Sequence, residues 1–172
     1  AITTSLGLTA NRSFAGSTHH LDYIKEETRR LDEIYAAALS QGGELTIYAG
    51  GDTSSQQDGT RSAFLSRFPR MKINIVVDYS KNHDVRVNNQ LATNSLVPDL
   101  VQLQTLQNFE RWKWQDRLLN YKPAGFKHIY PSLRDADGAW NSVIIYPFSF
   151  LVNQNQVSRS ITPEEFISSA WK

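Results

Sequence analysis

The chain of 172 residues contains no cysteine, which excludes disulfide bonds, thiolate metal sites and cysteine-based catalysis. No stretch approaches the roughly 18 consecutive apolar residues of a membrane-spanning helix. Neither sign of charge predominates, because acidic and basic residues balance to a net charge of +1. This balance gives no indication of binding to nucleic acid or to an anionic membrane. The N-terminus also lacks the charged and apolar regions of a signal peptide, which is either absent or already removed.

The first part of the chain changes character near Leu21. Residues 1–20 are small and polar without an apolar period, which predicts a flexible N-terminal arm. From Leu21 to Leu39, apolar residues recur mostly at three- and four-residue spacing, and this pattern predicts a helix. Glu26 and Arg30 lie four residues apart on its expected solvent side. The following glycine pair is expected to end the helix.

Three strand–loop–helix units follow. The strands are predicted at residues 44–49, 71–78 and 99–103, where β-branched and apolar residues gather. Helices are predicted around residues 63–68, 85–91 and 106–118. This alternation predicts an α/β fold in three layers, with a mainly parallel sheet between helices. Because ligands bind beyond the carboxyl ends of such strands, the chemistry is expected at residues 50–55, 79–84 and 104–106.

The C-terminal part is less regular. Residues 140–153 predict one long strand, or two strands interrupted at Pro147. Thr162 is a suitable N-cap, followed by proline and two glutamates, and this order is typical of a helix start. The sequence ends about two turns into that helix, on an apolar stripe that includes Trp171. We therefore expect the fold to be incomplete.

The order of these segments resembles a known family. ELTIYAGGD, then AFLSRFPRMKINIVVDYSKNHDVRV, then VPDLVQLQT are similar to extracellular solute-binding proteins of the type labelled ferric-iron ABC transport components. LLNYKPAGFKHIYPSLRDADGAW, VIIYPFSFLVN and ITPEEFISSAWK resemble the same family's approach to the hinge and the opening of its second lobe. The resemblance covers residues 30–172, and the first helix looks like that of fungal and some bacterial members.

The resemblance implies a type II periplasmic-binding-protein fold, whose two α/β lobes close on a ligand by a hinge motion. Residues 21–152 would form the first lobe, and residues 153–172 the hinge and the start of the second. It also implies a secreted or periplasmic location and the membrane subunits of an ABC transporter as partners. The cargo would be ferric iron, another metal complex or an organic anion. The tyrosines with which the family holds iron belong to its second lobe and are not in this sequence.

The loop after the first strand holds Gly50, Gly51, Asp52 and Thr53. Paired glycines allow a ligand to approach the backbone, and free N–H groups at a helix start attract anions. The Asp52 carboxylate would repel an anion unless a metal ion lay between them. A role in the turn and helix cap alone explains the same residues equally well.

The other two loops contribute further candidates. His83 and Asp84 offer an imidazole and a carboxylate to a metal ion, with Ser80 nearby. Alternatively, Ser80 caps the following helix and Asp84 interacts with its positive end. Gln104 and Thr105 either hydrogen-bond a ligand or cap the next helix. Tyr146 either contacts ligand or belongs to the core.

No nucleophile elbow, phosphate-binding loop or zinc-protease motif is present. The leading interpretation is therefore a binding module for a small molecule or a metal ion, and the sequence identifies no cofactor beyond iron or another metal as cargo. One alternative is an enzyme built on the same fold, which product formation would reveal. Another is a stand-alone lobe that acts as an interaction protein and self-associates through its exposed lobe interface.

Overall fold

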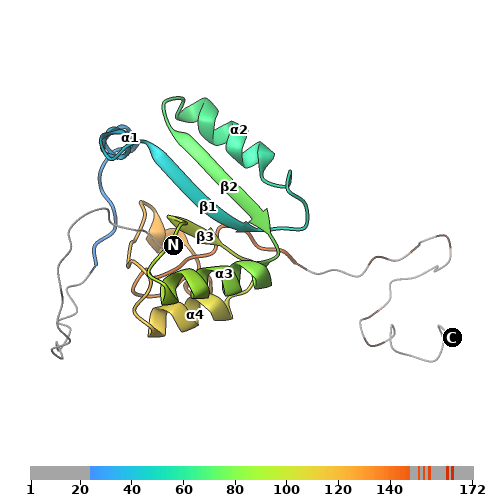
Figure 1. The fold of residues 1–172 in the computed structure, drawn as a ribbon. Helices are drawn as coiled ribbons and strands as arrows, with labels where there is room; N and C mark the ends of the chain where they lie inside the picture. The colour runs from blue at the N-terminus through green and yellow to red at the C-terminus, as the bar shows by residue number, and fades with distance from the viewer. Residues whose placement is uncertain are drawn as a thin grey trace. The chain divides into compact units, whose positions relative to one another are not determined.

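The computed structural model describes residues 24–147 together with residues 151, 153, 155, 162 and 164. The chain divides into two units, Ala1–Asn141 and Ser142–Lys172. All elements discussed below lie in the first unit, as Figure 1 shows. They are α1 (Leu31–Ser40), β1 (Glu44–Gly50), α2 (Asp58–Arg67), β2 (Lys72–Asp78), α3 (Ser80–Ala92), β3 (Leu100–Gln102), α4 (Gln107–Trp114) and the 3-10 turns η1 (Phe126–His128) and η2 (Pro131–Leu133).

The sheet has three strands in the order β2-β1-β3. Both strand pairs are parallel, and Ile47 of β1 is in register with Ile75 of β2 and Leu100 of β3. Each parallel connection needs a crossover, which α2 and α3 provide. The predicted α/β fold with a parallel sheet is therefore confirmed, and the strands predicted in the three strand–loop–helix units are present.

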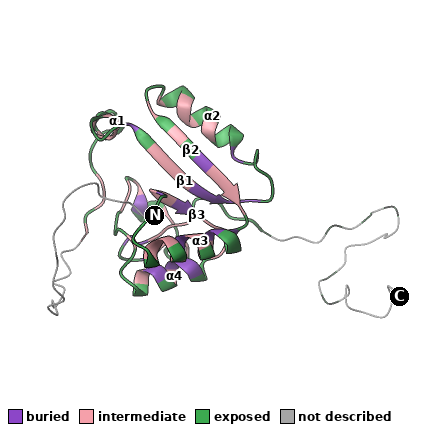
Figure 2. Cartoon of the chain, in the orientation of Figure 1, coloured by how far each residue is buried: buried purple, intermediate pink, exposed green. Residues whose placement is uncertain are grey.

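Helices cover both faces of this sheet (Figure 1). On one face, α3 and α4 enclose the main core, which Figure 2 shows in purple. On the other face, Phe64 of α2 and Tyr35 of α1 both contact the ring of Phe68, with ring centroids 5.0 and 5.1 Å apart. No residue of α2 is fully buried, so the core lies mainly on the α3–α4 side. The buried members of that core are Tyr48, Val87, Val101, Phe109 and Trp112.

Three helices end in the same way. A residue with positive φ stands two positions after the last residue of each helix, namely Gly42 (112°) after α1, Asn94 (53°) after α3 and Asp116 (56°) after α4. The next N–H then donates to a carbonyl five residues back, which is the Schellman arrangement. These bonds run from Gly43 to Ala38 (3.0 Å), from Ser95 to Gln90 (2.8 Å) and from Arg117 to Trp112 (2.9 Å). Glycine was expected to end α1, and that prediction is confirmed.

The start of α1 corrects the sequence prediction, because the helix begins at Leu31 and not at Leu21. Residues 24–30 are not helical. Glu26 forms a parallel bridge with Lys122, and the Glu27 N–H donates to the Lys122 carbonyl at 2.8 Å. The Glu26 carboxylate accepts a bond from the Gly125 N–H at 2.6 Å and not from Arg30. This long-range pairing prevails over the helical pattern of the sequence.

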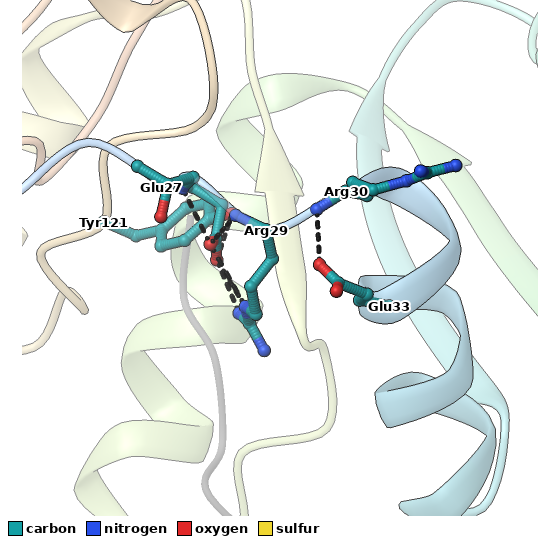
Figure 3. Close-up of polar contacts among 6 residues, drawn as sticks. Glu27, Arg29, Arg30, Glu33 and Tyr121 are labelled. Atoms are coloured by element: carbon teal, nitrogen blue, oxygen red, sulfur yellow. Dashed lines mark hydrogen bonds and ion pairs between the residues drawn. The ribbon is translucent and has the colours of Figure 1, made fainter.

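Local polar contacts complete this segment, as Figure 3 shows. The Glu27 carboxylate accepts bonds from the backbone N–H and the side chain of Arg29, and the Tyr121 hydroxyl donates to it at 3.4 Å. Hydrogen bonds from Arg29 lower the pKa of Glu27 to about 2. Glu33 then accepts the Arg30 N–H at 2.7 Å, which helps to start α1 at the residue that follows. We call residues 26–29 the clamp segment.

The expected strand at residues 140–153 is not found where the structure describes it. Within residues 140–147, only Asn141 pairs, in an isolated antiparallel bridge with Arg134. The predicted N-terminal arm and nearly all of the helix expected from Thr162 lie outside the described residues. Within the described part of the chain, no helix combines the length and the apolar character that crossing a membrane requires.

Candidate functional site

The loops after the three strands meet at the carboxyl edge of the sheet. The Gly51 N–H donates to the Asp78 carbonyl at 3.0 Å and joins the ends of β1 and β2. The Ser80 hydroxyl accepts the Gln104 N–H at 3.1 Å and joins the start of α3 to the loop after β3. The three predicted segments are therefore brought together by hydrogen bonds. We call this region the carboxyl edge.

The glycine pair at this edge permits close packing. A Cβ on Gly50 would lie 2.4 Å from Ser80 Oγ, and one on Gly51 would lie 2.7 Å from Val77 Cγ1. Both glycines are buried, so their missing side chains admit neighbouring protein atoms. Ser80 is also buried, and its hydroxyl bonds the Gln104 backbone and does not cap α3. Gly50, Gly51 and Ser80 therefore form the buried layer under the carboxyl edge.

His83 lies inside the molecule, beneath β1. Its side chain is fully buried, and its ring stacks on Tyr48 with centroids 4.9 Å apart. Its Nε2 donates to the Ala49 carbonyl at 3.1 Å, since a carbonyl can only accept. Its Nδ1 accepts from Arg86 at 3.1 Å, since a guanidinium can only donate. Both ring nitrogens are thus occupied, which favours a structural role over the metal-ligand role considered from the sequence.

Charge around His83 strengthens this arrangement. Burial lowers the pKa of His83, and the neighbouring Arg86 charge lowers it further, so the ring is held neutral. Arg86 also forms an ion pair with Asp78 at 2.9 Å. The pKa of Asp78 is lowered by hydrogen bonds from the Asn82 side chain and the Tyr79 N–H, together with Arg86. Asp78 therefore holds Arg86 against the histidine ring.

Asp84 is directed elsewhere. Its carboxylate forms an ion pair with Arg111 of α4 and accepts a bond from Asn88 Nδ2 at 2.9 Å. Adjacent residues on a helix point about 100° apart, so His83 and Asp84 do not converge on one point. Within the described residues there is no group of three or more His, Asp or Glu side chains placed to hold a metal ion. These positions therefore give no support to a metal centre in the described part of the chain.

The remaining candidates lie on the outer side of the carboxyl edge. Asp52, Thr53 and Gln104 are exposed, and the Asp52 N–H donates to Gln56 Oε1 at 2.8 Å. Thr105 is half-buried, and its hydroxyl oxygen is buried without a hydrogen-bond partner among the described residues. A buried hydroxyl without a partner destabilises a protein unless a ligand or water pairs with it.

Tyr146 belongs to the second unit and is exposed. The neighbouring Val143, Ile144 and Ile145 are exposed as well, with exposed fractions between 52% and 70%. The described residues of this unit thus present a short apolar run to solvent.

The sequence matches no protein-family model and no curated protein.

Two residues at this edge were not identified from the sequence. Arg86 joins Asp78, His83 and the face of the Tyr48 ring, over which its guanidinium lies 5.4 Å from the centroid. Its position three residues after His83 on a predicted helix was a usable signal, because such residues share a face. Gln56 closes the loop after β1 through the Asp52 N–H, and no sequence pattern indicated that bond.

Proposed function

We propose that this chain is a ligand-binding lobe of the type II periplasmic-binding-protein kind. It captures a small solute at the carboxyl edge and works outside the cytoplasm with the membrane subunits of an ABC transporter. The resemblance of residues 30–172 to extracellular solute-binding proteins motivates the family. The observation that carries the site is the buried Thr105 hydroxyl, which has no hydrogen-bond partner in the described part of the chain, beside exposed Gln104.

The convergence of the three loops supports this assignment. The bonds Gly51–Asp78 and Ser80–Gln104 fix the loop backbones before any ligand arrives. A rigid backbone reduces the ordering that binding requires and so favours affinity. In parallel α/β sheets, this edge is the general location of ligands.

The side chains at this edge suit a polar solute that carries hydrogen-bond donors. Asp52 contributes a carboxylate, and Thr53, Gln104 and Thr105 contribute neutral donors and acceptors. The predicted ligand-binding positions include no lysine or arginine. We therefore favour a neutral polyhydroxyl or a cationic solute over a free anion. For ferric iron, further ligands outside the described residues are required.

Thermal denaturation of the full chain with a panel of solutes tests this proposal. The panel contains a disaccharide, an amino acid, a polyamine, inorganic phosphate and ferric citrate. A bound solute at 100 times its dissociation constant stabilises the folded state by about 2.7 kcal/mol, which raises the melting temperature by several degrees. Gln104→Ala and Thr105→Val should reduce this shift, whereas Gln115→Ala, an exposed glutamine after α4, should not.

Thr105→Val separates function from stability. Valine matches threonine in shape but removes the unpaired hydroxyl, so the ligand-free variant should be about 1 kcal/mol more stable than the native chain. The same variant should bind the solute more weakly. A panel without any stabilising member, or a shift that both site variants retain in full, would overturn the proposed site.

A second candidate rests on the second unit. The exposed run Val143–Tyr146 is β-branched and aromatic, a composition that favours strand pairing. Under this reading, the lobe acts as an interaction protein that self-associates through this run. A molecular mass in solution that rises with concentration, without binding of any panel member, supports it over the solute-binding role.

A further inference from the structure

A pocket of about 330 Å³ opens beside η1, in the first unit of the chain. Glu26 of the clamp segment forms one wall, and the segment after α4 forms the remainder. Its volume lies at the lower end of the range for small-molecule sites. None of its lining residues belongs to the carboxyl edge. The lining includes Lys122, Phe126, Lys127, Pro131, Arg134 and Ala136.

The charges of this pocket are strongly unequal. The lining includes three cationic side chains, those of Lys122, Lys127 and Arg134, and one carboxylate, that of Glu26. The Glu26 carboxylate is already engaged by the N–H groups of Gly125 (2.6 Å) and Lys127 (3.4 Å). The positive charges of Lys127 and Arg134, next to apolar walls, attract an anion.

Arg134 is the best-positioned cation. Its Nη1 donates to the Phe126 carbonyl at 2.6 Å, and its guanidinium lies 4.7 Å from the centroid of the Phe126 ring. The Phe126 ring and carbonyl together hold the guanidinium in place, and the carbonyl bond occupies one of its five N–H donors. Among the residues that the structure describes, no carboxylate forms an ion pair with Arg134. A fixed guanidinium with free donors suits bidentate binding of a carboxylate or phosphate.

The apolar part of the lining indicates the rest of the ligand. Phe126 is buried beneath the cations, and Lys122 lies over the same ring, 5.8 Å from its centroid. Because Phe126 is only 3% exposed, the apolar surface that is open to a ligand comes from Pro131 and Ala136, which are both exposed. Inorganic phosphate alone would leave this surface uncovered. An anion with an apolar body would cover it and gain from its burial.

We propose that this pocket binds a small organic anion, a carboxylate or phosphate group on an apolar body, with Arg134 as its principal anion-binding residue. Glu26 limits the affinity, because its carboxylate shares the pocket with the bound anion. The site is independent of the carboxyl edge, and its ligand differs in charge from the solute proposed there.

Titration of the full chain with benzoate and with phenyl phosphate, followed by amide NMR shifts, tests this proposal. Benzylamine, with the same ring and the opposite charge, is the matched probe, and inorganic phosphate tests the need for the apolar body. Saturable shifts near residues 122–136 are expected with benzoate, phenyl phosphate or both, and not with benzylamine. Whichever of these two probes binds with the lower dissociation constant identifies the preferred anionic group.

Three variants decide the roles of the charges. Arg134→Gln should weaken binding by about tenfold or more, because a charge-assisted bidentate contact is lost. Glu26→Gln retains an oxygen that accepts the Gly125 N–H but removes the negative charge, so it should bind the anion several-fold more tightly. Arg67→Gln, the same change at an exposed position of α2, should bind as the native chain does. Equal shifts from benzoate and benzylamine, native affinity in Arg134→Gln, or no shift from either aromatic anion would refute the proposal.

Discussion

Acidification should destabilise this protein through His83, well before its carboxylates are protonated. The ring is fully buried, donates to the Ala49 carbonyl and accepts from Arg86. Protonation of Nδ1 would set its new N–H against the N–H of Arg86, so the hydrogen bond between them would be lost. It would also place a second positive charge beside the guanidinium. For both reasons, the folded state resists the proton that the unfolded chain accepts.

The sign and the size of the effect follow from the lowered pKa. Between the ordinary value of 6.5 and the lower folded value, the unfolded state binds more protons, so stability falls as pH falls. A single proton contributes at most about 1.4 kcal/mol per pH unit. The pKa values of Asp78 and Asp135 lie below their ordinary 3.8, so these carboxylates lose their contribution only in more acidic solution. Between pH 6.5 and about pH 5, the change in unfolding free energy therefore reports on His83 and not on these carboxylates.

Urea denaturation, monitored by tryptophan fluorescence, measures the unfolding free energy at each pH. The native chain should lose up to about 1.4 kcal/mol of unfolding free energy between about pH 7.5 and pH 5.5. His83→Gln should be less stable at both pH values, but its loss between them should be smaller by the same amount. His128→Gln, at an exposed histidine, should retain the native difference. An identical pH dependence in His83→Gln and the native chain would contradict the reasoning.

Two further predictions concern packing and association. Gly50→Ala should destabilise the fold by roughly 1–3 kcal/mol, because the new Cβ would lie 2.4 Å from Ser80 Oγ. Gly59→Ala, where no atom lies within 4 Å, should be neutral or stabilising, and Ser80→Ala should relieve part of the Gly50→Ala defect when the two are combined. If the apolar run at residues 143–146 drives self-association, Ile145→Lys should lower the average mass in sedimentation equilibrium. Ser66→Lys on α2 adds the same charge elsewhere and should leave that mass unchanged. Equal masses for the native chain and both lysine variants at high concentration would exclude self-association through residues 143–146.

The strand–loop–helix order was predictable because it depends on local periodicity. Apolar runs at β1 and β2 are long enough to be recognised, and the glycines after α1 mark its end. The start of α1 was not predictable, because the partner of Glu26 lies about 100 residues away at Gly125. No window of neighbouring residues contains that information.

The meeting of the three loops could be predicted from the sequence, whereas the directions of their side chains could not. Parallel-sheet topology brings the predicted loops to one edge, as the bond between Ser80 and Gln104 illustrates. The direction of each side chain depends on tertiary contacts. His83 and Asp84 are adjacent in sequence, yet one faces β1 and the other faces α4. Adjacency in the chain therefore gave no reliable guide to a shared ligand.

The clamp segment has a consequence for the order of folding. Its bridge between Glu26 and Lys122 encloses β1, β2, β3 and the helices α1 to α4 in one large loop. Closure of a long loop is entropically unfavourable until the intervening contacts have shortened it. The sheet and its helices should therefore assemble first, and residues 26–29 should be among the last to join. During synthesis, these early residues must wait for Lys122 to emerge, although they leave the ribosome well before the strands that they enclose.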